Sequence, residues 1–248
     1  MATTAQKRVA LITGAASGIG RAIAICLAKD GIAVAVNYVG DPSKADQVVN
    51  EIKETGGTAR AFHADVSNVA AIIGLFNDVL QEYGGIDIVI ANAGVGMKLA
   101  PIIDATEADF DRINSVNYKG TFFVMQQAAK HVRDGGRIIQ ISSTSSLYPA
   151  PGLGVYAPSK AAGKVITEIL AQELGPRQIL VNSVFPGPTK TPLIEKVSKE
   201  ELERIEQAMF LGRMGEPEDV ANVVAFLVSP EGSWVNGQQI IVNGGGRI

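Results

Sequence analysis

Short apolar runs alternate with helical patterns along the chain, and this alternation limits the possible folds more than any other feature. Because nearly every residue in a run is apolar, both faces of each strand must be covered, as in a parallel sheet between two helical layers. The pattern predicts an α/β fold with about seven parallel strands, at residues 9–12, 33–36, 59–63, 86–91, 137–141, 179–185 and 240–242.

Helical periodicity and capping residues occupy the segments between these strands. Ser67 is expected to cap one helix, and Thr106, followed by Asp109, is expected to cap another in a pattern like a capping box. No repeat, linker or low-complexity segment interrupts the pattern, so residues 1–248 are expected to form a single domain. The main expected helices span residues 19–29, 42–54, 67–83, 116–133, 158–174, 199–209 and 217–228.

Composition argues against several classes of protein. Hydrophobic residues make up 46% of the chain and the formal net charge is -3, which suits a globular protein without nucleic-acid or membrane-surface partners. Cys26 is the only cysteine, which fits a reducing compartment, and the two histidines, His63 and His131, form no metal-ligand grouping. We found no signal peptide and no apolar run long enough to span a membrane, so a cytoplasmic protein without a metal is expected.

A glycine-rich turn follows the first expected strand and opens the first expected helix, at residues 13–20. Gly14, Gly18 and Gly20 allow a tight turn and let backbone N–H groups approach a phosphate, while the helix directs its positive end at the anion. The spacing G-x-x-x-G-x-G differs from the G-x-G-x-x-G fingerprint. Its place at the carboxyl end of a strand nevertheless favours a dinucleotide site over a simple turn.

Tyr156 and Lys160 are four residues apart in an expected helix and therefore share one helix face. A phenol titrates at about pH 10, and a nearby ammonium lowers that pKa by favouring the phenolate. The pair can therefore act as a tuned proton donor and acceptor. The alternative is an ordinary solvated helix face, because this spacing also arises by chance.

These residues belong to a set of motifs that resembles the short-chain dehydrogenase/reductase family over nearly the whole chain. Residues 13–20 match T-G-x-x-x-G-x-G, and Tyr156 with Lys160 matches Y-x-x-x-K. Ser143 lies thirteen residues before Tyr156, where the family places its catalytic serine, and Asn117 matches the family's helix asparagine.

Three further segments match family motifs near strand ends. Residues 92–94 match N-A-G, residues 186–191 match P-G-x-x-x-T, and the asparagine–glycine pairs after residue 235 match the C-terminal pattern. One departure is Ala91, where many members carry a second asparagine. The resemblance implies a Rossmann-type domain with helices on both faces of the sheet.

The resemblance also implies a reaction in which hydride passes between a nicotinamide and a carbonyl carbon. Tyr156 would donate a proton to the carbonyl oxygen, and Ser143 would donate a hydrogen bond to it. Lys160 would lower the pKa of Tyr156 and bind the nicotinamide ribose, and Asn117 would hold a water that links Lys160 to solvent.

The expected cofactor contacts lie on the turns that follow the strands. Asp65 and Val66 would lie near the adenine, although Asp65 could instead serve only to cap a helix. Together with Tyr156 and Lys160, the expected cofactor residues are Gly14, Ser17, Gly18, Ile19, Gly20, Asn37, Asp65, Val66, Asn92, Ala93, Gly94, Pro186, Gly187, Thr189 and Thr191.

The residue at the end of the second strand bears on the choice of cofactor. A carboxylate there would bind the ribose hydroxyls and repel a 2′-phosphate, whereas Asn37 is neutral and could donate a hydrogen bond to the phosphate. NADP(H) is therefore expected in preference to NAD(H), which stays possible because Ser17 is not basic and Asp41 lies nearby.

The substrate is less constrained than the reaction. The pattern is most similar to 3-oxoacyl-acyl-carrier-protein reductases and general ketone reductases, so a small-molecule or acyl-thioester carbonyl is expected, with sugar or polyol dehydrogenases as the alternative. A non-catalytic dinucleotide sensor and a nucleotide-sugar epimerase or dehydratase are the competing classes. Residues 191–214 are expected to form a substrate lid, with Met97 among the pocket residues.

Apolar residues on the helices at 116–133 and 158–174 suggest a two-fold interface, which the resemblance extends to a homotetramer.

Overall fold

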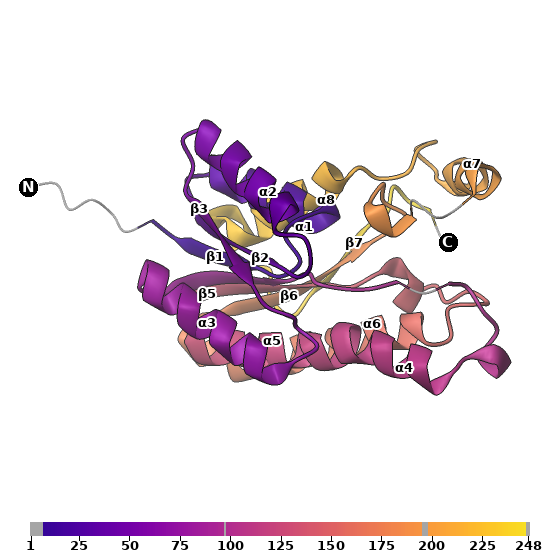
Figure 1. Ribbon diagram of the computed structural model, residues 1–248, viewed down its shortest axis with the longest axis horizontal. Helices are drawn as coiled ribbons and strands as arrows, with labels where there is room; N and C mark the ends of the chain where they lie inside the picture. The colour runs from indigo at the N-terminus through magenta and orange to yellow at the C-terminus, as the bar shows by residue number, and fades with distance from the viewer. Residues whose placement is uncertain (1–6, 97, 195–197, 247–248) are drawn as a thin grey trace, which may run out of the picture.

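Seven parallel strands form one twisted sheet at the centre of the protein, in the order β3-β2-β1-β4-β5-β6-β7 (Figure 1). The computed structural model describes residues 7–96, 98–194 and 198–246; Met97, named above for the pocket, lies outside them. The strand order reverses between β1 and β4, which pair directly. The strands are β1 (Val9–Ile12), β2 (Ala33–Tyr38), β3 (Ala59–His63), β4 (Ile86–Ala91), β5 (Val132–Ile141), β6 (Leu180–Pro186) and β7 (Gln239–Val242).

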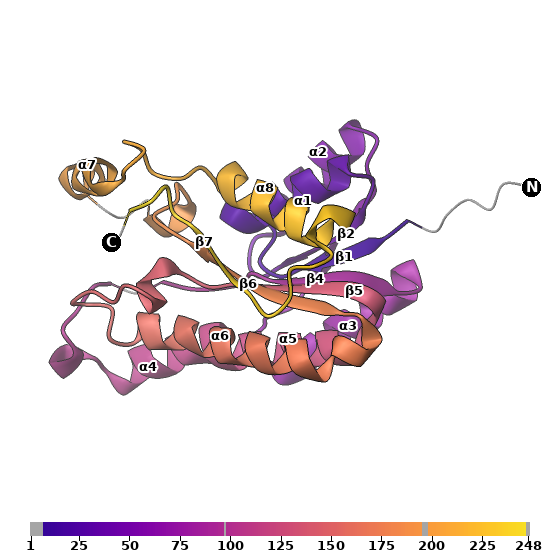
Figure 2. The same ribbon diagram turned by 180° about the vertical axis from the view of Figure 1, so that it is seen from behind.

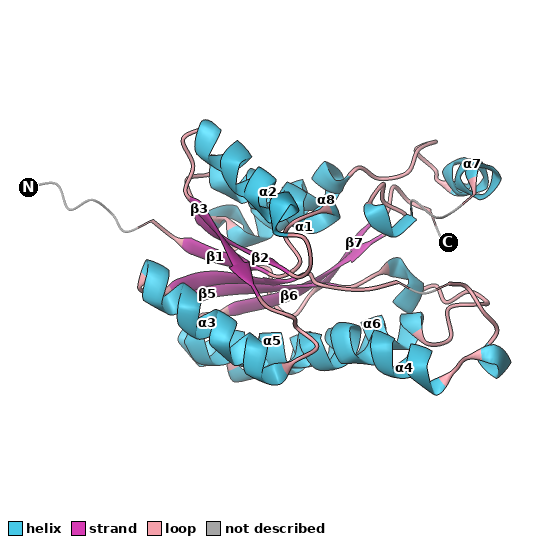
Figure 3. Cartoon of the chain, in the orientation of Figure 1, coloured by secondary structure: helices cyan, strands magenta, loops and turns pink. Residues whose placement is uncertain are grey.

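Helices cover both faces of this sheet, which confirms the predicted doubly wound fold (Figures 1 and 3). α1, α2 and α8 lie on one face and α3, α5 and α6 on the other, and the same two layers are seen from behind in Figure 2. The helices are α1 (Gly18–Lys29), α2 (Pro42–Glu54), α3 (Val69–Tyr83), α4 (Glu107–Asn114), α5 (Thr121–His131), α6 (Tyr156–Glu173), α7 (Lys199–Ala208) and α8 (Pro217–Val228).

Alternating side chains of each strand supply two separate cores. Ile12 and Val34 pack toward the α1 layer, whereas Leu11 and Val89 pack toward the α3 layer. All four side chains are fully buried, so both faces of the strands lack solvent contact. At roughly 1.5 to 3 kcal/mol for each large apolar side chain removed from water, these two cores dominate the favourable side of the folding free energy.

Some expected element boundaries are wrong, each for a local reason. β2 continues past residue 36 because Asn37 and Tyr38 pair with β3. The helix expected to end at residue 133 ends at His131, because Val132 already pairs with Ile86 of β4. The expected cap of α3 is also shifted: the Asn68 side chain accepts the capping hydrogen bonds from the backbone N–H groups of residues 70 and 71.

Thr106 caps α4 as predicted, since its hydroxyl accepts a hydrogen bond from the backbone N–H of Asp109 at 3.1 Å. Between α4 and α5 the chain forms a stretch of π-helix, Ser115–Gly120, so one helical rod runs from residue 107 to residue 131. Local π-helix is uncommon and occurs often at functional sites. This stretch carries Asn117, which is 1% exposed.

Candidate active site

A cleft of about 580 Å³ opens at the carboxyl ends of the strands, where the strand order reverses. This is the place at which open α/β sheets bind ligands. Most of the expected cofactor residues line this cleft. They come from the turns after β1, β2, β3 and β4 and from the first turn of α6. The expected residues in its lining are Gly14, Ser17, Gly18, Ile19, Gly20, Asn37, Asp65, Val66, Asn92, Ala93, Gly94, Tyr156, Lys160 and Thr191.

The glycine-rich turn is shaped to hold a phosphate. Ser17 stands at the N-cap of α1, and its side chain makes no capping hydrogen bond, so the first N–H groups of the helix are left for an anion. Gly20 is required by close approach, because a Cβ atom there would lie 2.4 Å from the carbonyl oxygen of Gly14. A bound dinucleotide therefore fits the residues present, with its phosphates at this turn.

Two asparagines hold this turn against the sheet. The Asn92 amide donates to the carbonyl oxygens of Thr13 at 2.9 Å and Gly14 at 3.2 Å. The Asn37 side-chain oxygen accepts from the Gly14 N–H at 3.2 Å, and its amide donates to the carbonyl oxygens of Phe62 and Ala64 at 3.3 and 3.0 Å. Both amides thus have their two hydrogens committed to backbone carbonyls.

The expectation that the Asn37 amide donates to a cofactor phosphate is therefore wrong. Its side chain is 1% exposed and is fully used in bracing the turn. Tyr38, the next residue, is half-buried, lines the cleft and packs edge-on against His63. Asn37 also lines the cleft, but its polar atoms are bonded to the backbone, so Tyr38 is the position of β2 that can meet an adenosine ribose.

Asp41 and Asp65, the carboxylates nearest this end of the cleft, both bind backbone N–H groups. Asp41 accepts from Ser43 N at 2.9 Å, and this bond to the backbone is the main reason that its pKa is lowered. Asp65 accepts a hydrogen bond from Ser67 N at 2.8 Å, which stabilises the local turn, and it also lines the cleft.

Tyr156 and Lys160 start helix α6 and face the cleft together. Lys160 is 5% exposed, and its ammonium donates to the carbonyl oxygen of Ile141 at 3.1 Å. Burial lowers the pKa of Lys160 to about 8. Gly94 leaves room for this ammonium, since a Cβ atom at residue 94 would lie 2.9 Å from Nζ.

The pKa of Tyr156 is raised by burial, and a hydrogen bond with the Ser143 hydroxyl acts in the opposite direction. The expected lowering of this pKa by Lys160 stays a prediction, and the group that favours the phenolate here is the Ser143 hydroxyl. Tyr156 and Lys160 line the cleft; Ser143, in the turn after β5, is not part of the lining, but its hydroxyl acts on Tyr156 through a hydrogen bond.

Asn117 joins this group from the π-helical stretch. Its side-chain oxygen accepts from Val95 N at 2.8 Å, and its amide donates to Val95 O at 2.9 Å and to the Ser159 hydroxyl at 3.2 Å. Ser159 in turn donates to the backbone carbonyl of Tyr156 at 2.6 Å. The side chain of Asn117 therefore ties the loop after β4 to α6, and any water that it helps to hold must bind elsewhere than at its amide hydrogens.

The serines after β5 form a connected network, not an irregular loop. The Ser143 oxygen accepts from Ser145 N at 3.2 Å and from the Ser145 hydroxyl at 2.9 Å. Ser142 donates to the carbonyl oxygen of Lys160 at 3.1 Å, and Ser146 donates to that of Ser143 at 2.6 Å. Sequence reasoning identified Ser143 only by its offset from Tyr156 and missed Ser145 and Ser159, for which the sequence offers no signal beyond the clustering of serines.

The segment after β6 covers the cleft from the other side. Thr191 lies against Gly18 of the glycine-rich turn, and Leu193 lies against Gly96. Pro186 and Gly187 sit at the end of β6, where Gly187 N donates to the carbonyl of Val242. Thr189 lines a separate, smaller cavity of about 230 Å³, and none of these three expected cofactor residues lines the cleft.

Two absences hold for residues 7–96, 98–194 and 198–246, the described parts of the chain. No group of three or more histidine, cysteine, aspartate or glutamate side chains is placed to hold a metal ion. No described helix has the length and apolar character needed to cross a membrane.

Comparisons with known proteins agree with this geometry. A family model described as Enoyl-(Acyl carrier protein) reductase matches residues 14–246. The chain is 43% identical to the short chain dehydrogenase/reductase nsrJ of Aspergillus novofumigatus, covering 96% of this chain and 95% of that protein. It is 40% identical to a hydroxynaphthalene reductase-like protein, Arp2, of Metarhizium majus, with 96% and 94% covered.

A solved structure is similarly close. The angucycline C-6 ketoreductase LanV with bound NADP has a TM-score of 0.91 and 37% identity, covering 96% of this chain and 95% of that chain. Identity of this extent over nearly the full length, together with the matched family model, establishes relationship and not only a shared fold. The chain belongs to the short-chain dehydrogenase/reductase family.

Proposed function

We propose that this protein reduces a ketone to a secondary alcohol, reversibly, with NADP(H) as the preferred cofactor and in a reducing compartment such as the cytoplasm. The observation that carries the proposal is the meeting of Tyr156, Ser143 and Lys160 beside the glycine-rich turn. The bound nicotinamide supplies or accepts the hydride. A non-catalytic sensor would need the turn but not this group of side chains.

Each side chain has a separate part in the reaction. Tyr156 donates its proton to the carbonyl oxygen, on which negative charge grows as the carbonyl carbon is reduced. Ser143 donates a hydrogen bond to the same oxygen, and Lys160, whose pKa of about 8 lets it titrate near neutral pH, accepts or supplies protons on the Tyr156 side of the site. Asn117 and Ser159 hold α6 in place for these contacts.

The turn, the ends of β2 and β4, and Thr191 would hold the cofactor. Preference for NADP(H) is supported by the absence of a carboxylate at Tyr38 and by relatives in the family with bound NADP, such as the ketoreductase LanV. NAD(H) is the alternative cofactor.

The substrate that we propose is a ketone on an apolar skeleton. Val95 and Leu193 line the cleft near its catalytic end. A second cavity, of about 700 Å³, lies between the loops at 99–102 and 149–154 and is lined mostly by apolar side chains, including Leu99, Ile102 and Leu153. The names of the relatives, hydroxynaphthalene reductase-like and angucycline C-6 ketoreductase, point to apolar ketones, and we extend this to acyl thioesters. Sugars and polyols fit such a lining poorly.

A substrate panel separates these possibilities. Oxidation of NADPH would be followed with bicyclic aromatic ketones, acetoacetyl thioesters and sugars under the same conditions. We expect turnover of the first two classes, and turnover of sugars alone would overturn the substrate proposal. The role of Tyr156 is tested by Tyr156→Phe, which should reduce kcat at least about 100-fold and leave cofactor affinity within a few-fold, because the hydroxyl acts in the transition state.

The control for that variant is Tyr83→Phe. It removes the same hydroxyl at a tyrosine that bonds the carbonyl of Val34, away from the catalytic group. Turnover of Tyr156→Phe near that of the unmodified protein would contradict the assignment.

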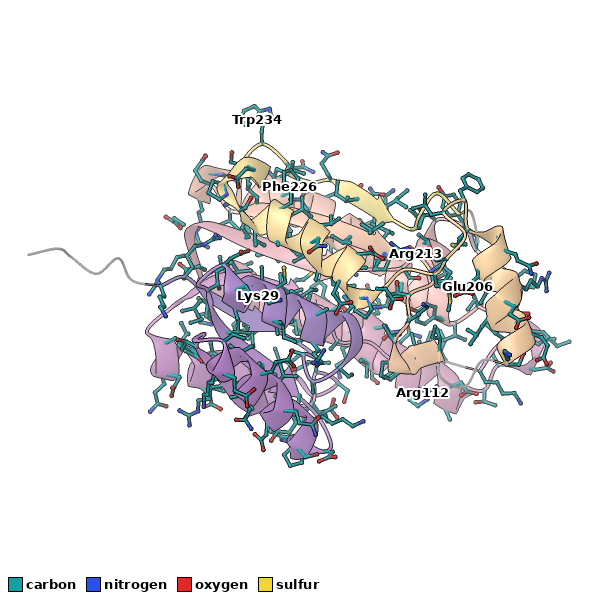
Figure 4. The ribbon with its side chains drawn as sticks, turned by 90° about the horizontal axis from the view of Figure 1, so that it is seen from above. Lys29, Arg112, Glu206, Arg213, Phe226 and Trp234 are labelled. Carbon is teal, nitrogen blue, oxygen red and sulfur yellow. The ribbon has the colours of Figure 1, made fainter. Side chains whose placement is uncertain are left out.

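We also propose a homotetramer, which needs two different contact surfaces. One is formed by the rod from α4 to α5 together with α6, where Phe122, Val165 and Ile169 are between 41% and 53% exposed. The other is near α8 and β7, where Trp234 is 98% exposed and stands away from the body beside Phe226 (Figure 4). Light scattering at micromolar concentration should give about four times 26.0 kDa, and Trp234→Ser should lower it to a dimer. A monomer mass for the unmodified protein would exclude this assembly.

A further inference from the structure

The hydrogen bonds around Ser143 leave its oxygen with no free acceptor position. A serine hydroxyl has two acceptor lone pairs and one donor hydrogen. The Ser143 oxygen accepts from the backbone N–H of Ser145 at 3.2 Å and from the hydroxyl of Ser145 at 2.9 Å. The one remaining capacity of Ser143 is therefore to donate its own hydrogen.

That direction matters because Tyr156 stands next to Ser143. If Ser143 had a free lone pair, the Tyr156 hydroxyl could donate to it, and its proton would then point at Ser143 and away from the substrate oxygen. With both lone pairs filled, Ser143 can only donate toward Tyr156 or the substrate. Burial raises the pKa of Tyr156, and a hydrogen bond with Ser143 acts in the opposite direction.

We propose that Ser145 is a positioning residue for the reduction: its hydroxyl occupies the second acceptor position of the Ser143 oxygen, so that Ser143 acts only as a donor. The chain Ser145 O–H to Ser143 O–H to the reacting oxygen also polarises each bond in turn. This inference rests on the proposed function, because it concerns the same carbonyl oxygen.

The neighbouring serine provides a matched control. Ser146 lies in the same turn and has the same hydroxyl, but that hydroxyl donates to the backbone carbonyl of Ser143 and not to its side chain. Any effect of Ser146→Ala on kcat must therefore arise from a change in the conformation of the turn. It cannot depend on whether residue 143 has a hydroxyl.

The experiment is a double-mutant cycle on kcat, using the best ketone of the panel. Ser145→Ala should lower kcat about three- to tenfold with KM nearly unchanged, the range of one neutral hydrogen bond. Ser145→Thr keeps a hydroxyl and should restore most of the activity. In a Ser143→Ala background, Ser145→Ala should change kcat by less than about twofold, whereas Ser146→Ala should have the same effect in both backgrounds.

A spectroscopic titration gives a readout that does not depend on turnover. Phenolate absorbance of the protein minus that of Tyr156→Phe reports the ionisation of Tyr156, and its pKa should move upward in Ser145→Ala but not in Ser145→Thr. The other ionisable groups that line the cleft are Lys160 on α6, Arg112 on α4, Tyr38 on β2 and Asp65 after β3, and none contacts Ser145 in the described hydrogen-bond network.

The outcomes separate the two proposals. Loss of activity in Tyr156→Phe and Ser143→Ala, with an equal loss from Ser145→Ala in both backgrounds, would overturn the role of Ser145 and leave the proposed function standing. Near-normal activity in both Tyr156→Phe and Ser143→Ala would overturn the proposed function and this inference with it.

Discussion

The two walls of the cleft are built in opposite ways. The wall formed by the ends of β1, β2, β4 and β5 is fixed by buried polar side chains: Asn37 and Asn117 are each 1% exposed, and their amides are bonded to backbone or to Ser159. The opposite wall is the segment after β6, from which Thr191, Pro192 and Leu193 line the cleft. Farther along this segment, α7 has no buried described residue, and Phe210 and Leu211 are 77% and 69% exposed.

We propose that this difference separates chemistry from selectivity. The side chains proposed to act on the carbonyl all belong to the fixed wall, where satisfied polar groups hold geometry in a medium that strengthens each hydrogen bond. In the segment after β6, Met209 and Met214, which flank Phe210 and Leu211 in the sequence, are buried. A segment with few buried contacts can open and change sequence at little cost to the fold.

The first prediction concerns Asn37→Asp, which changes one atom of the fixed wall. A carboxylate oxygen would replace the amide nitrogen that donates to the carbonyls of Phe62 and Ala64, so three oxygens would face one another without solvent. We expect a loss of about 3 kcal/mol or more in the free energy of unfolding. Urea titration followed by circular dichroism measures it.

Asn50→Asp is the matched control, because Asn50 is exposed on α2 and the same change there should alter stability by less than about 0.5 kcal/mol. If Asn37→Asp were as stable as this control and used NADH in preference to NADPH, then Asn37 would face the cofactor after all.

The outcome for Asn37 shows what the sequence could and could not predict. The apolar run predicted the strand that contains Asn37, and the order of elements predicted that a cofactor would bind near the end of that strand. Which of two neighbouring residues can contact a cofactor depends on which of them has its polar atoms bonded to the backbone, and β2 runs two residues further than expected because it pairs with β3. Hydrogen bonds between distant backbone segments, such as that from Asn37 to Ala64, leave no local pattern.

The side chains proposed to act on the carbonyl show the same division. Tyr156, Lys160 and Ser143 could be identified because their spacing matches a family motif. Ser145 and Ser159 could not, because their roles depend on which hydroxyl donates to which in three dimensions. The effect of burial on the pKa of Tyr156 was also hidden, since the sequence shows the nearby lysine but not the loss of solvent.

The second prediction tests the choice of cofactor at Tyr38, the half-buried last residue of the same strand. Tyr38→Asp places a carboxylate where it can bind ribose hydroxyls and repel a 2′-phosphate. The ratio of kcat/KM for NADPH to that for NADH should fall about 10- to 100-fold, which corresponds to the usual strength of one charged hydrogen bond. Tyr38→Asn, nearly equal in shape to the aspartate but neutral, should change the ratio much less. An unchanged ratio in Tyr38→Asp would show that this position does not meet the ribose.

The third prediction concerns Lys160, whose ammonium is buried in the fixed wall at a cost in folding free energy. Burial lowers its pKa from 10.5 to about 8, so the unfolded chain holds this proton more tightly than the folded protein. Below about pH 8 both states carry the proton and the full penalty of burying it is present; between pH 8 and 10.5 the penalty shrinks, because the folded protein has already released the proton.

Lys160→Met should therefore be inactive but more stable than the unmodified protein, by about 1 to 2 kcal/mol near pH 7. The advantage should decrease steadily as the pH rises toward 10.5. Thermal unfolding of both proteins at matched pH values measures this, and Lys164→Met, at a half-exposed position one turn later in α6, is the control expected to show no such trend. A stability difference independent of pH would contradict the assigned titration.

The smallest effect is expected at the lid, in Phe210→Ala. The ring is 77% exposed and rests on Gly245, so its removal should change the free energy of unfolding by less than about 0.5 kcal/mol. Phe185→Ala, at a fully buried side chain of β6, should cost about 3 to 5 kcal/mol. If the lid selects the substrate, Phe210→Ala should nevertheless alter KM for apolar ketones several-fold, with kcat for the smallest ketone unchanged. A large loss of stability would mean that this wall is as firmly built as the other, and an unchanged KM across the panel would mean that Phe210 takes no part in selection.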